Sequence, residues 1–265
     1  MSESIPVNEF ATEPRDAPAP VPAMQLQTWH LIITALFAAG LAWPVLMHFE
    51  GAFPMENLTV EMTNRIRANA EDPIAWAKER QNQWDAVSRN SILNLGVFGT
   101  CLGLCLSLTL ALVRGGPFWS MARTWAYGTG LGMIAGIAGG YLSARTAFAL
   151  GRGKEFDVTL RSSLIHASGW IVPGLACGVI LGLALGRRRL VRPAFGGMIG
   201  GLLAALLYEP LAAILFQLDR SDIPLPEGAG NKLMFLGLAA VLMLVGAWSA
   251  EVLPAARVGA PHGPG

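Results

Sequence analysis

The sequence predicts an all-α protein, a polytopic transmembrane bundle of about six helices. Of its 265 residues 53% are apolar and only 14% are Asp, Glu, Lys or Arg, whereas about 25% is usual in a soluble domain. The mean hydropathy is +0.46. Six apolar stretches each approach the roughly 20 residues that a helix needs to cross about 30 Å of hydrocarbon.

The same composition excludes several classes of protein. A chain so apolar is not disordered, and it is not an ordinary soluble enzyme. The formal net charge is only +1, so the protein has no basic field that would attract nucleic acid. We therefore expect the lipid bilayer as the main partner and no nucleic acid.

The six predicted spans are bounded by charged residues, Pro or Gly. A backbone exposed to lipid must satisfy its own hydrogen bonds, so each span is expected to be a helix. The region before the first span is acidic rather than basic, which favours an uncleaved anchor over a signal peptide. The spans cover residues 27–48, 91–113, 124–144, 164–186, 194–216 and 233–253.

The Lys and Arg residues of the short loops indicate the orientation. Arg187, Arg188, Arg189 and Arg192 crowd the loop between the fourth and fifth spans, and the positive-inside rule places such a loop in the cytoplasm. Six spans then put both termini in the cytoplasm. The basic residues between the third and fourth spans oppose this assignment.

Three segments lie outside the predicted spans. Residues 1–26 contain five prolines and are expected to form an extended cytoplasmic tail. Residues 49–90 are expected to form two extracytoplasmic helices, the first capped by Asn57 and the second starting at Asp72-Pro73. A protein partner is expected to dock on residues 49–90 or on the two tails; the alternative for residues 49–90 is an amphipathic connector. Residues 254–265 are rich in Pro and Gly and are expected to be disordered.

Glycines repeat at a spacing of four residues inside the spans, which places them on one face of each helix. Small residues let helix backbones approach closely in lipid, where no hydrophobic force drives helices together. The rows therefore predict helix packing, and the alternative is that they line a pore. They comprise Gly99 and Gly103, then Gly128, Gly132, Gly136 and Gly140, then Gly174, Gly178, Gly182 and Gly186, and finally Gly196 and Gly200 beside a second row with Gly197 and Gly201.

Two hairpins repeat along the chain. The row from Gly99 to Arg114 matches the row from Gly174 to Arg189 at an offset of 75 residues, and Gly128 matches Gly196 at an offset of 68. Spans 91–113 and 124–144 are thus expected to resemble spans 164–186 and 194–216. Parallel repeats occur in some transporters, and they also arise by duplication of a packing unit.

The fifth span carries a family resemblance. The segment RPAFGGMIGGLLAALLYEP, from Arg192 to Pro210, resembles the glycine-zipper hairpins of uncharacterised bacterial multi-pass membrane proteins. Some of those hairpins are attached to signalling or phosphopeptide-binding domains, which this sequence lacks. The resemblance implies a protein of the bacterial inner membrane and supplies no catalytic residue.

Glu209 is the only acidic residue well inside a predicted span. It lies about 15 residues from the inner end of its span, or about 22 Å, so it is expected near the outer interface. Its expected partners are Arg145, Arg161 and His166 at the outer ends of the third and fourth spans. Such a carboxylate forms a structural ion pair, reaches outer water or serves as a proton or ion site.

No other motif points to chemistry. The cysteines and histidines are scattered without metal-ligand spacing, and no nucleotide-binding or nucleophile motif occurs. We therefore expect no catalytic residue, cofactor or metal. The interpretation that follows is a non-enzymatic scaffold or anchoring component. The alternative is a transporter or channel for ions or small solutes that uses the repeated hairpins and Glu209.

Overall fold

The computed structural model describes residues 26–49, 52–53, 64, 73–115, 118–151, 157–186 and 189–258. In this part of the chain the regular elements are helices, and all six are long and apolar enough to cross a membrane. They confirm the all-α fold, and the protein is a multi-pass membrane protein. The helices are α1 (Thr28–His48), α3 (Pro73–Arg114), α4 (Phe118–Leu150), α5 (Val158–Leu185), α6 (Val191–Leu215) and α7 (Ala229–Val258).

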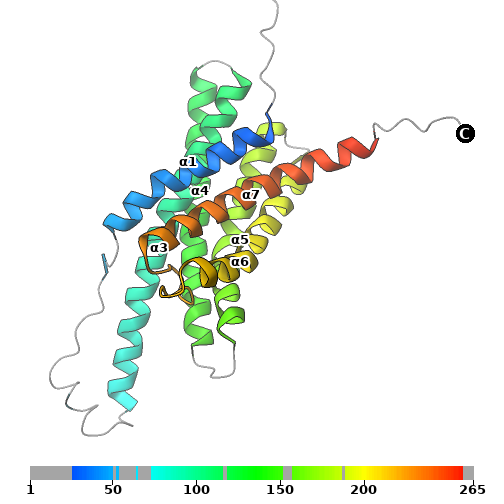
Figure 1. Cartoon of the computed structure of the whole chain (residues 1–265). Coiled ribbons are helices and arrows are strands. Elements are labelled where there is room, and N and C mark those ends of the chain that lie inside the picture. The colour runs from blue at the N-terminus through cyan, green and yellow to red at the C-terminus, as the bar shows by residue number, and fades with distance from the viewer. Residues whose placement is uncertain are drawn as a thin grey trace, which may run out of the picture.

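The bundle consists of two antiparallel hairpins and two crossing helices. Helices α3 and α4 form one hairpin, α5 and α6 form the other, and α4 packs on α5 to join them. Helices α1 and α7 run diagonally across the hairpins, and the first turns of α3 extend past the ends of α4 and α5 (Figure 1). Helix α1 contacts both α3 and α7, so the first and last helices of the chain are neighbours.

The core of the bundle is apolar and is shared by α1, α3, α5, α6 and α7. Two polar contacts also join the crossing helix α1 to the rest. The Thr34 and Thr109 hydroxyl oxygens lie 2.7 Å apart between α1 and α3. The Trp43 indole nitrogen donates a hydrogen bond of 2.8 Å to the Ala229 carbonyl oxygen at the start of α7. These contacts fix α1 against both neighbours.

Helix α3 is much longer than a membrane span. It begins at Pro73, a favoured first helical residue, and continues without a break to Arg114, where Gly115 follows at φ +61°. Its 42 residues extend about 63 Å at 1.5 Å per residue, about twice the thickness of the hydrocarbon. The helix predicted from Asp72-Pro73 and the second span are therefore one rod.

Two expected boundaries need correction. Helix α7 continues to Val258, so residues 254–258 are helical rather than disordered. Helix α5 ends at Leu185, which leaves Gly186 outside the span. The expected tail before residue 26, the helix capped by Asn57 and the last seven residues of the expected C-terminal tail lie outside the described part of the chain.

Candidate functional site

The glycine rows of α3 and α4 face each other, and the two backbones are in direct contact. A Cβ atom on Gly99 would overlap the carbonyl oxygen of Gly132, and one on Gly103 would overlap that of Gly128. Nothing larger than hydrogen fits at these positions, so close backbone contact holds the hairpin together. Two more members of the α4 row lie in the same way against α3 carbonyl groups: Gly136 against Leu95, and Gly140 against Ser91.

The second hairpin is packed by the same device. The row on α5 lies against the backbone of α6 and of the residue before it. A Cβ atom on any member of this row would overlap or crowd a backbone atom of the facing chain. The pairs are Gly174 with Gly197, Gly178 with Pro193, and Gly182 with Leu190.

Helix α6 carries a second glycine row that faces a different neighbour. Gly196 lies against the Gly246 carbonyl of α7, and Gly200 lies against the Leu242 carbonyl. The adjacent row, one residue further along, faces α5 through Gly197. Helix α6 is therefore pressed between two backbones, and this explains why its glycines come in adjacent pairs.

These contacts correct the register of the internal repeat. Gly99 lies against Gly132 in the first hairpin, and Gly174 lies against Gly197 in the second. Gly132 and Gly197 are the equivalent positions, and they are 65 residues apart rather than 68. The sequence match aligned Gly132 with Gly200, which faces α7 instead. Spacing identifies a face of α6 but does not say which neighbour covers it.

Gly186 does not belong to a packing row, contrary to the prediction. It caps the C-terminus of α5 at φ +121°, and its amide donates to the Gly182 carbonyl oxygen. Apart from the adjacent residues of the chain, no atom lies within 4 Å of the position that a Cβ atom on Gly186 would take. The glycine is needed for this backbone conformation, which side chains disfavour.

Glu209 lies in a polar cluster at the end of α5, and serine hydroxyls contact both of its oxygens. Ser162 Oγ of α5 donates to Glu209 Oε2 at 2.5 Å. Ser221 Oγ, in the loop between α6 and α7, donates to Glu209 Oε1 at 3.0 Å. Only 6% of Glu209 is exposed. The carboxylate therefore connects the loop after α6 to α5.

His166 reaches the same loop without contacting the carboxylate. Its Nε2 lies 2.8 Å from the Ser221 carbonyl oxygen. The His166 ring stacks on Trp170 with centroids 5.5 Å apart and meets Tyr208 and Phe235 edge-on. The Tyr208 hydroxyl donates at 2.7 Å to Asn231 Oδ1 on α7. This buried aromatic cluster, which consists of His166, Trp170, Tyr208 and Phe235, joins α5, α6 and α7.

The predicted ion pair of Glu209 is wrong. None of its three expected basic partners pairs with it among the described residues. Arg161 instead lies 3.7 Å from Asp222 of the same loop, His166 contacts the loop backbone, and Arg145 lies in a pocket between α3 and α4. Hydroxyl donors thus take the place of charge. Hydrogen bonds to a carboxylate are shorter and stronger than those between neutral groups. Two serine hydroxyls can therefore stabilise Glu209 in place of a basic side chain.

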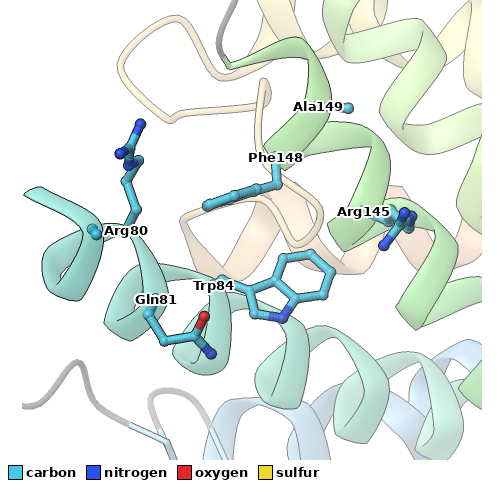
Figure 2. Close-up of a pocket in the computed structure, with 7 residues that line it drawn as sticks. Arg80, Gln81, Trp84, Arg145, Phe148 and Ala149 are labelled. Carbon is cyan, nitrogen blue, oxygen red and sulfur yellow. The ribbon is translucent and has the colours of Figure 1, made fainter. Parts of the chain in front are cut away.

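The pocket around Arg145 is the second polar feature of this end of the molecule. It has a volume of about 560 Å³ and lies between the outer turns of α3 and the end of α4. Figure 2 shows that Arg80, Gln81 and Trp84 come from α3, whereas Arg145, Phe148 and Ala149 come from α4. Two guanidinium groups and two aromatic rings therefore line one opening.

Several residues of these sites were missed in the sequence. Ser162 and Ser221 are ordinary serines, and neither stands in a motif. Gly139 lies against Gly169 and Pro173 between α4 and α5, and its position next to Gly140 was a signal, because adjacent glycines on α6 likewise face two neighbours. Gly246 of α7 had no such signal.

The described residues contain no group of three His, Cys, Asp or Glu side chains that could hold a metal ion. No family model matches the chain, and comparison with curated proteins and with solved structures finds no similar chain.

Proposed function

We propose that this protein is a non-enzymatic scaffold of a bacterial inner membrane, which anchors a partner protein at the projecting end of α3. The observation that carries the proposal is the continuity of α3, a single rod about 63 Å long that packs in the bundle over most of its length and whose first turns extend past α4 and α5 (Figure 1). A helix that must hold a partner at a fixed distance from a membrane needs such stiffness.

The glycine contacts support a static role. Backbones that touch at Gly99, Gly103, Gly174 and Gly178 leave no path between the members of either hairpin. Their complementary surfaces also resist sliding, because a shift of one residue would bring side chains against carbonyl groups. A rigid base of this kind suits an anchor.

The Glu209 cluster supports the same role. Both carboxylate oxygens accept hydrogen bonds from serine hydroxyls, and the Glu209 side chain is buried. A transport site must be open to water at some stage. The closed cluster instead fixes the loop between α6 and α7.

Photo-crosslinking in native membranes tests the anchoring role. A photoreactive residue at Lys78 or Gln83, both exposed near the start of α3, should yield one defined protein adduct. The matched control is Leu112 near the other end of the same helix, which is 64% exposed and should label lipid. A second variant, Lys78→Glu with the probe at Gln83, should reduce the adduct. Absence of a protein adduct at both positions would refute the proposal.

A second candidate function is transport of protons or small ions through Glu209. It is favoured by three nitrogen atoms in and beside the buried aromatic cluster, each without a hydrogen-bond partner among the described residues: His166 Nδ1, Trp170 Nε1 and Asn231 Nδ2. Polar atoms of this kind are usually satisfied by buried water. Ion flux that depends on Glu209 would favour this candidate over the scaffold.

A further inference from the structure

The pocket between α3 and α4 contains two arginine side chains that have no acidic partner among the described residues. Arg80 and Arg145 are both exposed, and neither forms an ion pair with a described residue. The nearby acidic side chains of α3 are occupied otherwise: Glu79 accepts a hydrogen bond from Gln83, and Asp85 accepts one from Gln81. Two guanidinium groups that are not ion-paired among the described residues therefore line the opening, where both can bind one anion.

The height of the pocket in the bilayer follows from the arginines of α4. Arg123 and Arg145 are the only charged residues of that helix, and the 22 residues from one to the other correspond to about 33 Å. This matches the thickness of the hydrocarbon, about 30 Å. Arg145 thus lies at its edge, and Phe148 and Ala149 lie just beyond it, in the layer of lipid headgroups.

The walls of the pocket are aromatic and continue toward the hydrocarbon. The Trp84 ring lies 5.3 Å from the Phe148 ring and 6.2 Å from the Tyr141 ring, measured between centroids. Tyr141 and Ile134 precede Arg145 by 4 and 11 residues, which places all three on one side of α4. Both are exposed large apolar residues, so they offer a path for an acyl chain below the pocket.

We propose that this pocket binds the headgroup of an anionic phospholipid, with Arg145 on the phosphate and Arg80 at the outer end of the headgroup. Arginine binds phosphate oxygens through two parallel hydrogen bonds, and Trp and Tyr favour the interface between lipid and water. The small side chains of Ala77 and Ala149 leave the space open. About 560 Å³ is within the usual range of small-molecule sites, about 300–1,000 Å³.

An anionic lipid fits these observations better than a soluble anion or an acidic peptide. The site adjoins the exposed apolar residues of α4, and a soluble ligand would leave them unused. The lipid proposal is independent of the anchoring role, because the ligand is different and neither Lys78 nor Gln83 lines the pocket.

Native mass spectrometry of the purified protein tests the site. The full-length chain in detergent is titrated with phosphatidylglycerol, with phosphatidylcholine of the same acyl chains, and with inorganic phosphate. We expect phosphatidylglycerol to bind about tenfold more tightly than phosphatidylcholine, and Arg145→Gln to remove most of this preference. Arg80→Gln should weaken phosphatidylglycerol binding by a smaller factor, because Arg80 lies further from the hydrocarbon than Arg145.

The matched control is Arg123→Gln, the same substitution on the same helix at the opposite membrane edge. It should leave the affinity for phosphatidylglycerol unchanged. Equal binding of the two lipids, or an equal loss in Arg123→Gln and Arg145→Gln, would overturn the proposal. Tight binding of inorganic phosphate alone, lost in Arg145→Gln, would overturn the lipid assignment and point to a soluble anion.

Discussion

Ser162 and Glu209 are joined by a hydrogen bond of 2.5 Å between α5 and α6. The same carboxylate accepts a second hydroxyl from Ser221, so one buried side chain connects two helices and a loop. Glu209 has no ion pair with a described residue. A carboxylate inside a membrane protein is costly, and these two donors offset part of that cost.

The first prediction concerns this contact. Ser162→Ala removes one donor from a buried carboxylate and should lower the free energy of unfolding by about 1–3 kcal/mol. Ser168→Ala is the matched control on the same helix, because the Ser168 hydroxyl donates only to the Ile165 carbonyl of its own helix. Thermal unfolding in detergent measures both, and equal losses would show that the contact with Glu209 is unimportant.

The second prediction concerns flux. Glu209→Gln keeps the size of the side chain and removes its charge. If Glu209 serves only to hold the loop, the variant should lose stability. Vesicles that contain the wild type or the variant should then show no more proton flux than vesicles without protein. A pH-sensitive dye inside the vesicles reports the flux. Flux in wild type that is abolished in a folded Glu209→Gln variant would establish the transport alternative.

The third prediction compares two glycines of α4. Gly132→Ala places a methyl group against the Gly99 carbonyl oxygen and should destabilise the bundle by about 1–3 kcal/mol, as overpacking does elsewhere. Gly130→Ala on the same helix meets nothing within 4 Å. It should leave stability unchanged or raise it by up to about 1 kcal/mol, since alanine favours helix. The midpoint of thermal unfolding in detergent measures the stability of both variants. An unchanged midpoint for Gly132→Ala would mean that this face of α4 is loosely packed.

The fourth prediction concerns orientation. Single cysteines replace Arg189 and Gln83 in a chain whose own three cysteines are changed to alanine. A membrane-impermeant thiol reagent should label the Gln83→Cys chain in intact cells, whereas the Arg189→Cys chain should react only after the membrane is opened. The reverse pattern would invert the assigned topology.

The six helices could be predicted because the thickness of the bilayer imposes a length on every apolar run. The ends of the helices could not be predicted in this way, because α3 and α4 continue as helices beyond their apolar segments. The helical start at Pro73 was readable, because Asp-Pro marks such a start. The end of α5 at Leu185 was missed, because Gly186 continues the spacing of a packing row while serving as a cap.

The candidate site was only partly predictable. Glu209 stands out in any reading because a carboxylate in a span is rare. The partners of Glu209 do not stand out in the sequence, because Ser221 reaches the carboxylate from a loop and Ser162 resembles any serine in a helix. The pocket of Arg80 and Arg145 joins residues that are 65 positions apart, and only the register of α3 against α4 brings them together.

The contact between α1 and α7 has a consequence for the making of the protein. Each glycine-packed hairpin joins helices that are consecutive in the chain, so it can close soon after its second helix enters the bilayer. Helix α1 is synthesised first, yet the hydrogen bond from Trp43 to the Ala229 carbonyl joins residues 186 positions apart. Helix α1 therefore lacks its contact with α7 until translation is almost complete, and a chain that ends before α7 leaves this face of α1 uncovered.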